Sequence, residues 1–364
     1  MTARTTASAE MDHPGQHLLI GLPGPELDDS TEALLKEIMP GGICLFSRNI
    51  REARQTRDLV DGIRELLPYE PILCIDQEGG RVDRLRKIFT PMPEPGRIRS
   101  VADVVELASI IARSIRLLGL NMTLAPVVDI LEHPRDNLNN GLVGRSFGST
   151  KVETTQLAGR FLRTLNENGC QGCIKHFPGL GASRVDSHEE LPVVDLGNDE
   201  FNDVDLYPYR KLMSTGEVHA IMIAHAAFPD LSLQENDQNG RLLPSSLSRS
   251  MVNGLLRGEM GFTGLVLSDD LEMGAILKNF GIHEASVMSL NAGVDMVAIC
   301  ADPDNIRRAC DAVASDLASG KLDNAGSAAR IAEFRSRLAS PVDFDTFEID
   351  SLSSRVDSLC ARLD

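Results

Sequence analysis

The sequence predicts an α/β fold: a single (β/α)8 barrel of the TIM type, whose strands need not be regular, followed by a C-terminal helical extension. Short apolar runs rich in β-branched residues alternate with helical patterns, and eight such runs match the strand count of this barrel. Charged and histidine side chains gather where the runs end, the side on which barrel enzymes build their sites. An open, doubly wound sheet is the alternative, because alternation alone does not close a barrel.

The eight runs show no polar alternation, which is typical of strands buried on both faces of a parallel sheet. The predicted strands are residues 18–22, 41–47, 71–77, 122–130, 172–177, 220–228, 264–270 and 294–300. The polar residues at their C-terminal ends are Asp76, Asp129, Lys175, His176, His225, Asp269 and Asp270. We expect these side chains to share one rim of the barrel.

Helical patterns fill the intervals between the strands. The first, residues 29–38, begins with an Asp-x-x-Glu arrangement in which Asp29 accepts backbone N–H bonds and Glu32 reaches back. Several of the others stop at a glycine, which suits a left-handed C-cap. These other helices are expected over residues 101–119, 154–169, 245–261 and 283–293.

The same patterns divide the chain into three parts. Residues 1–14 are polar and rich in small side chains, and we expect them to be disordered. Residues 15–340 are expected to form the barrel that carries the site. Residues 341–364 are expected to form an extended link and a terminal amphipathic helix that packs on the barrel.

Composition restricts the partners and the compartment. A formal net charge of −17, without a long basic run, disfavours nucleic acid as a partner. No run approaches the roughly 18 apolar residues of a membrane span, and the apolar stretch near the N-terminus is too short for a signal peptide. Seven cysteines scattered through apolar stretches indicate buried free thiols in a reducing compartment. We therefore expect a cytoplasmic protein without a membrane partner.

The segment GLVLSDDLEMGAI places Asp269 and Asp270 directly after an apolar strand. An aspartate at such a turn often only caps the next helix by accepting its N–H bonds. A carboxylate at the end of a barrel strand can also face the pocket as a nucleophile or a stabiliser of charge. The residues alone support these two interpretations equally.

The segment IDQEGGRVDRL repeats the pattern, with Asp76 at the end of a strand, the pair Gly79-Gly80 after it, and Arg84 nearby. Paired glycines allow the backbone to approach a ligand. A carboxylate beside a guanidinium group suits the recognition of sugar hydroxyls. Phosphate binding is disfavoured, because neither a Walker nor a dinucleotide fingerprint is present.

Two further segments add candidate ligand contacts: Arg145 in VGRSFG, and Lys175 with His176 in KHF. A lysine at the end of a buried strand rarely lacks a partner. We therefore expect a carboxylate or a ligand opposite Lys175.

In KHFPGLGASRVDSHEELP, residues 175–192, Asp186 and His188 stand two residues apart on a glycine-rich loop. A short turn can bring this carboxylate to the imidazole, where it would fix the tautomer and stabilise the protonated ring. His188 would then act as a general acid/base. The alternative is an Asx-turn with a solvent-facing histidine, the commoner role of an isolated Asp-x-His.

Other chemistries find little support. The Gly-x-Ser-x-Gly elbow of serine hydrolases is absent. The spacing of His176 and His188 is not that of known metal ligands, and the Cys170-x-x-Cys173 motif has no second pair after it. We expect neither a metal ion nor another cofactor.

Eight short stretches follow one another between residues 41 and 276: GGICLFSRNI, CIDQEGGRVDRL, LAPVVDI, GRSFG, KHFPGLG, DSH, MIAHAAFP and LVLSDDLEMGAI. Together they resemble the catalytic barrel of glycoside hydrolase family 3, and within it most closely the bacterial β-N-acetylglucosaminidases. The resemblance implies a retaining β-glycosidase with Asp269 as nucleophile, and His188 paired with Asp186 in place of a carboxylic acid/base. The sugar contacts that it implies are Asp76, Arg84, Arg145, Lys175 and His176.

The resemblance also implies the substrate, a terminal β-linked N-acetylglucosamine, in bacterial peptidoglycan recycling typically on an anhydro-N-acetylmuramoyl peptide. The chemistry agrees, because a retaining mechanism needs an attacking carboxylate and a group that first protonates the leaving oxygen and then activates water. An imidazole, with an ordinary pKa of about 6.5, can perform both proton transfers near neutral pH.

One departure from the family loop stands out. The loop commonly reads KHFPGHGD, whereas this chain has Leu180 and Ala182 at the positions of the second histidine and the aspartate. Because Asp186 and His188 are present, we expect the acid/base pair to be kept. The placement of the loop and the preference for leaving groups are where we expect a difference.

Four functions remain open at this point. Hydrolysis of N-acetylglucosaminides comes first, and a β-glucosidase on the same site is a variant of it. A phosphorolytic enzyme is the second possibility, since an imidazole does not repel an incoming phosphate as a carboxylate does. The altered loop motivates a catalytically inactive sugar-binding module.

Overall fold

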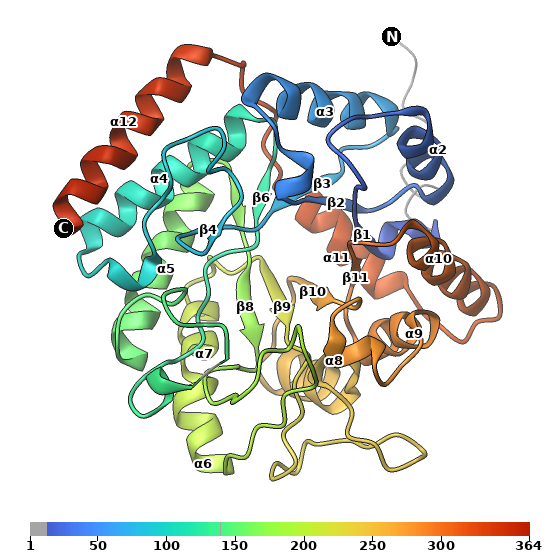
Figure 1. The fold of residues 1–364 in the computed structure, drawn as a ribbon. Coiled ribbons are helices and arrows are strands. Elements are labelled where there is room, and N and C mark those ends of the chain that lie inside the picture. The colour runs from blue at the N-terminus through green and yellow to red at the C-terminus, as the bar shows by residue number, and fades with distance from the viewer. Residues whose placement is uncertain (1–12, 139) are drawn as a thin grey trace.

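A computed structural model describes residues 13–138 and 140–364 (Figure 1). Disorder was predicted for residues 1–14. Of these, residues 1–12 lie outside the described residues. Pro14 begins the short helix η1 (Pro14–His17), and the His13 side chain accepts the Gly15 N–H at its start.

The fold is a (β/α)8 barrel. In the described part of the chain, nine parallel strand segments form one sheet in the order β7, β6, β3, β2, β1, β11, β10, β9, β8. The two outermost segments, β7 (Gln171–Gly172) and β8 (Ile174–Phe177), are consecutive parts of one strand interrupted at Cys173. The sheet therefore closes on itself, which confirms the barrel and excludes the open sheet.

The eight predicted strands are confirmed, with shorter bounds in most cases. The remaining strands of the barrel are β1 (Leu18–Gly21), β2 (Gly42–Leu45), β3 (Ile72–Ile75), β6 (Met122–Thr123), β9 (Ala220–Ile223), β10 (Leu265–Asp270) and β11 (Met296–Ile299). The barrel helices surround these strands in Figure 1. A separate antiparallel pair, β4 (Gln77–Gly79) and β5 (Val82–Asp83), follows β3.

Both faces of the strands are buried, which explains their continuous apolar sequence. Outward residues such as Ile43 and Leu73 pack in the large core between strands and helices. Inward residues such as Cys44 and Cys74, which lie opposite each other in register, fill the barrel. Phe334 of α11 (Ala325–Ser336) belongs to the same inner cluster. In the described chain all seven cysteines are unpaired and six are buried, as predicted.

The predicted helices are confirmed with two corrections. α2 (Asp29–Ile38) has the expected bounds, but its N-cap is Asp28, whose side chain accepts the Thr31 N–H at 2.8 Å. Asp29 is already the first helical residue, so it cannot be the cap. The helix predicted over 245–261 divides into a short turn, η6 (Ser245–Leu247), and the π-helix η7 (Ser250–Glu259). The hydrophobic pattern does not distinguish a π-helical hydrogen-bond register from an α-helical one.

The other helices complete the outer layer. They are α3 (Ala53–Leu66), α4 (Val101–Leu117), α5 (Lys151–Glu167), α6 (Asn198–Glu200), α7 (Tyr207–Met213), α8 (Gly274–Leu277), α9 (Ile282–Ala292) and α10 (Pro303–Ala318). No helix in residues 13–138 and 140–364 combines the length and the hydropathy that crossing a membrane would require.

The last helix, α12 (Thr346–Leu363), lies along α4 on the outside of the barrel (Figure 1). Its buried residues Leu352, Val356 and Leu359 are spaced three and four apart, so they share one face. Three partly exposed ion pairs join the two helices: Arg113 with Glu348, Arg355 with Glu106, and Arg362 with Asp103. Such pairs contribute at most about 1 kcal/mol each, so the apolar face holds α12 in place.

Candidate active site

The C-terminal ends of the strands surround a cavity of about 200 Å³. All eight side chains that the sequence predicts as site residues line it. They are Asp76 and Arg84 after β3, Arg145 in the loop after β6, Lys175 and His176 of β8, Asp186 and His188 in the loop after β8, and Asp269 of β10. The parallel strands thus bring together residues that lie up to 193 positions apart in the sequence.

One wall of the cavity is a network of ion pairs, which we call the wall network. Arg145 donates two parallel bonds of 2.8 Å to the two oxygens of Glu78. Lys175 Nζ lies 2.7 Å from Glu78 Oε1 and 2.5 Å from Asp76 Oδ1. Arg84 Nη2 lies 3.6 Å from Asp76 Oδ2. Lys175 therefore contacts two carboxylates, Asp76 and Glu78, where the sequence predicted a carboxylate or a ligand.

Charge pairing, rather than burial, decides the protonation of this network. Burial alone would raise the pKa of Glu78, but Lys175 and Arg145 hold this pKa far below its ordinary value of 4.5. Burial alone would lower the pKa of Lys175, but Asp76 and Glu78 raise it above its ordinary value. Both groups are therefore charged at neutral pH, and each keeps the other oriented.

The hairpin of β4 and β5 presents Arg84 to the cavity. Gln77 accepts the Arg84 N–H at 2.9 Å, and its amide donates to Asp83 at 2.8 Å, which holds the end of the hairpin. Gly79 and Gly80 have positive φ angles of 103° and 58°, which glycine adopts readily. A Cβ at Gly79 would lie 2.4 Å from the Pro93 carbonyl oxygen. These glycines therefore admit a neighbouring chain segment, and neither of them is among the residues that line the cavity.

His176 is held by Asp129, which lies six residues after the end of β6. The His176 Nδ1 atom lies 2.7 Å from Asp129 Oδ2, and the Leu180 N–H donates to Asp129 Oδ1 at 2.7 Å. Leu180 also lines the cavity, and the half-buried Ala182 packs against the core. The loop keeps its contact with Asp129 although residue 180 is a leucine, because Asp129 binds the backbone N–H of Leu180 and not its side chain. Ala182 fits the loop because its small side chain packs against the core.

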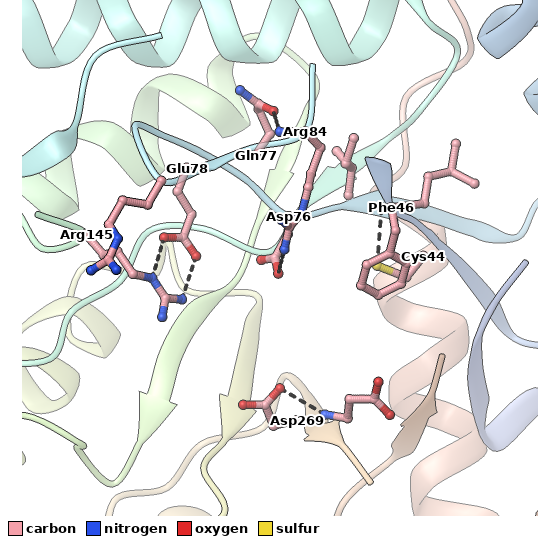
Figure 2. Close-up of polar contacts among 12 residues, drawn as sticks. Cys44, Phe46, Asp76, Gln77, Glu78, Arg84, Arg145 and Asp269 are labelled. Carbon is pink, nitrogen blue, oxygen red and sulfur yellow. Dashed lines mark hydrogen bonds and ion pairs between the residues drawn. The ribbon is translucent and has the colours of Figure 1, made fainter. Parts of the chain in front are cut away.

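Asp269 faces the wall network across the cavity, as Figure 2 shows for Asp76, Glu78 and Arg145. Its Oδ1 accepts the Asp270 N–H at 2.9 Å. Burial alone would raise the pKa of Asp269, but His176, His225 and the Asp270 N–H hold it below its ordinary value. Asp269 is therefore ionised at neutral pH, as an attacking carboxylate must be.

The neighbouring Asp270 differs from Asp269, although both line the cavity. Its Oδ1 accepts the Glu272 N–H at 3.0 Å, which is a capping contact. Burial, together with Glu272 and Asp269, raises the pKa of Asp270 to about 7. The pair thus divides into an ionised carboxylate and one that is close to half protonated at neutral pH.

The predicted contact between Asp186 and His188 is present. The His188 Nδ1 atom lies 2.7 Å from Asp186 Oδ1, and the His188 backbone N–H donates to the same oxygen at 3.0 Å. Burial opposes these bonds, but they hold the pKa of Asp186 below its ordinary value. Because Asp186 occupies Nδ1, the Nε2 atom of His188 is left for proton exchange. The His188 side chain is 71% exposed, on a loop at the mouth of the cavity.

Neither Glu78 nor Asp129 was predicted to act in the site, although each orients residues that were. The sequence placed Asp129 on the rim with Asp76 and Asp269, because it follows an apolar run, but gave it no role. Glu78 carries no such signal, because its inward direction depends on the β4–β5 hairpin. Within the described residues, no group of three or more His, Cys, Asp or Glu side chains could hold a metal ion. Cys170 and Cys173 are both buried, and burial raises the pKa of the Cys170 thiol to about 12.

The fold and the cavity define a barrel enzyme for a polar substrate. Fixed carboxylate and guanidinium groups offer both acceptors and donors to hydroxyl groups. An ionised carboxylate on the opposite side and an imidazole at the mouth add the elements of nucleophilic and acid/base chemistry. The arrangement is that of a carbohydrate-cleaving enzyme.

Comparison with known proteins identifies the family. The glycosyl hydrolase family 3 N-terminal domain matches residues 9–334. β-Hexosaminidases of Tolumonas auensis and Pseudomonas aeruginosa are each 33% identical to this chain, over 288 and 290 residues, covering 78% of this chain and 82% of each relative. The chain belongs to glycoside hydrolase family 3 and is a glycoside hydrolase.

Solved structures agree with this assignment. A family 3 β-N-acetylglucosaminidase from Paenibacillus sp. str. FPU-7 is similar with a TM-score of 0.85 and 31% identity, covering 97% of this chain and 69% of that chain. A family 3 glycosyl hydrolase of Mycobacterium smegmatis is similar with a TM-score of 0.79 and 28% identity, covering 94% of this chain and 100% of that chain.

Proposed function

We propose that this protein is a retaining β-N-acetylglucosaminidase that releases terminal β-linked N-acetylglucosamine. The observation that carries the proposal is the joint position of Asp269 and the pair of Asp186 and His188 around one cavity. Relatives named β-hexosaminidase and β-N-acetylglucosaminidase support the choice of sugar.

In the first step, the Asp269 carboxylate attacks the anomeric carbon, and a bond forms between its oxygen and that carbon. The bond to the leaving oxygen breaks, and protonated His188 gives its Nε2 proton to that oxygen. Asp186 stabilises the imidazolium before this transfer. The product of the step is a glycosyl ester on Asp269.

In the second step, neutral His188 takes a proton from a water molecule as the water attacks the anomeric carbon. The ester bond to Asp269 breaks, the carboxylate is restored, and the sugar leaves with its original β configuration. The low pKa of Asp269 supports both roles of this carboxylate, because it must be ionised to attack and stable as a leaving group.

The wall network and His176 are proposed to bind the sugar hydroxyls. Asp76, Arg84, Lys175 and Arg145 are already held by ion pairs before substrate arrives, and this pairing limits the reorganisation that binding would require. Because the network contains carboxylates as well as cations, it suits a neutral sugar better than a phosphorylated one.

We further propose that the natural substrate is a muropeptide of peptidoglycan recycling and that the protein acts in the cytoplasm. The similarity to bacterial β-hexosaminidases supports the substrate, and the buried, unpaired cysteines suit a reducing compartment. Release of N-acetylglucosamine from a purified anhydromuropeptide, followed by mass spectrometry, tests the substrate directly.

The activity is tested with nitrophenyl β-N-acetylglucosaminide and nitrophenyl β-glucoside side by side, at neutral pH without added metal. We expect preference for the former, and activity on the latter alone would indicate a β-glucosidase. The Asp269→Asn variant should keep the fold and lose turnover, and a fluorinated N-acetylglucosamine derivative that keeps the acetamido group at C2 should label Asp269 in the native protein. Unchanged turnover in this variant would contradict the mechanism.

The same assay separates the alternatives. In phosphate buffer, the appearance of a sugar 1-phosphate would identify phosphorolysis, which the imidazole acid/base permits. Binding of N-acetylglucosamine without turnover and without a covalent adduct would identify an inactive binding module.

A further inference from the structure

The loop that carries Asp186 and His188 is bound to the segment that follows the proposed nucleophile. The Gly274 N–H donates to the His188 carbonyl oxygen at 3.2 Å, and the Ala275 N–H donates to the Ser187 carbonyl oxygen at 3.2 Å. Both donors lie in α8, which begins four residues after β10 ends. The acid/base loop therefore contacts the same chain segment that carries Asp269.

These two bonds support the part of the loop around His188. Within the described residues, they are the backbone hydrogen bonds that join residues 183–190 to other elements. The remaining backbone bonds of this stretch stay within the loop, such as Glu189 to Asp186 and Ser183 to Leu180. Asp129 and Asn140 bind the start of the loop, and α8 holds the part that carries His188.

The close approach requires a glycine at position 274. A Cβ added to Gly274 would lie 2.4 Å from the Glu189 carbonyl oxygen and 2.7 Å from the His188 carbonyl oxygen. Both are backbone atoms, so they cannot move aside without moving the loop. Gly274 opens an ordinary α-helix. The constraint is therefore one of space and not of backbone torsion.

We propose that Gly274 is a positioning residue, which docks the acid/base loop against α8 so that His188 reaches the leaving oxygen of a substrate bound at Asp269. The inference rests on the proposed function. It does not make Gly274 a catalytic residue, because the glycine acts only through His188. A side chain at position 274 should weaken protonation of the leaving group while it leaves the attack by Asp269 intact.

The test compares Gly274→Ala with the native protein on two N-acetylglucosaminides. A dinitrophenyl glycoside departs without protonation, whereas a phenyl glycoside needs the general acid, whose contribution is typically about 10²- to 10⁴-fold. A displacement of about 1 Å can cost about 10²-fold in such a step. We expect kcat/KM for the phenyl glycoside to fall about 10- to 100-fold and kcat/KM for the dinitrophenyl glycoside to change less than about threefold.

Azide provides a second readout, because it attacks the glycosyl ester without base assistance. It should raise kcat of Gly274→Ala on the dinitrophenyl glycoside and form a glycosyl azide. Gly197→Ala is the matched control, since its added Cβ would meet no atom within 4 Å. This control should resemble the native protein on both substrates.

His188→Ala separates the two proposals. If the native protein turns over both glycosides and His188→Ala loses activity mainly on the phenyl glycoside, the proposed function stands. Under that condition, a Gly274→Ala variant that equals Gly197→Ala overturns the positioning role. An equal loss on both substrates also overturns it, because it would indicate general damage to the site.

Discussion

Glu78→Gln removes the buried carboxylate at the centre of the wall network while it keeps the size of the side chain. Glu78 is 1% exposed as a side chain, and its partners Arg145 and Lys175 are 13% and 2% exposed. Lys175 keeps Asp76 as a partner, but Arg145 loses the carboxylate that binds both of its nitrogens. Removing one partner of a buried ion pair costs about 3–5 kcal/mol.

We expect the free energy of unfolding of Glu78→Gln to fall by about 3 kcal/mol, the lower end of that range, because the amide oxygen still accepts one bond. Urea unfolding, followed by circular dichroism, measures this value. Glu26→Gln is the control, since its ion pair with Arg51 is 2.6 Å long but exposed, and its loss should cost at most about 1 kcal/mol.

Catalysis should change as well. Without Glu78, Arg145 is no longer held in place and Lys175 loses one of its two carboxylate partners, so KM for the N-acetylglucosaminide should rise and kcat/KM should fall by about tenfold or more. Equal stability losses in Glu78→Gln and Glu26→Gln, with unchanged kcat/KM, would refute the reasoning.

The pH dependence gives an independent check. The folded state lowers the pKa of Glu78, so its contribution to stability is present above the ordinary value of 4.5 and is lost as pH falls below it. The stability difference between the native protein and Glu78→Gln should therefore be constant near neutral pH and shrink below about pH 4.

Two further predictions concern other parts of the site. Because burial raises the pKa of Asp270 to about 7, the native protein loses stability as pH rises from about 4 to about 7, so Asp270→Asn should gain stability relative to the native protein over that range and show a constant difference above it in urea titrations. An unchanged difference across that range would contradict the assignment. A Cβ at Gly181 would lie 2.0 Å from the Ile130 carbonyl oxygen, so Gly181→Ala should displace the loop and reduce kcat/KM by about 10²-fold, whereas native activity would contradict this placement.

The strands and the rim were predictable from the sequence because they depend on local information. Strands buried on both faces must be apolar throughout, and parallel strands bring all their C-terminal ends to one rim. Asp76, Lys175 and Asp269 could therefore be placed together before any contact between them was known. The contact of Asp186 with His188 was also accessible, since it spans only two residues.

The supporting contacts were not predictable, because they join residues that are distant in the sequence. Glu78 and Arg145 are 67 positions apart, and their pairing requires both the β4–β5 hairpin and the loop after β6. The hydrogen bond from the Gly274 N–H to His188 likewise depends on how α8 and the acid/base loop meet. No hydrophobic periodicity or sequence motif predicts such contacts.

Backbone groups of the acid/base loop bind the side chains of Asp129 and Asn140 where the loop leaves β8, and they bind α8 near His188. This makes it a unit that can be exchanged for engineering. A loop grafted from a relative would be expected to keep its alignment if Asp129 and Gly274 are retained in the recipient barrel. The side chain of Leu180, which lines the cavity and takes no part in these bonds, could then be varied to alter the choice of leaving group without disturbing the groups proposed to hold the sugar.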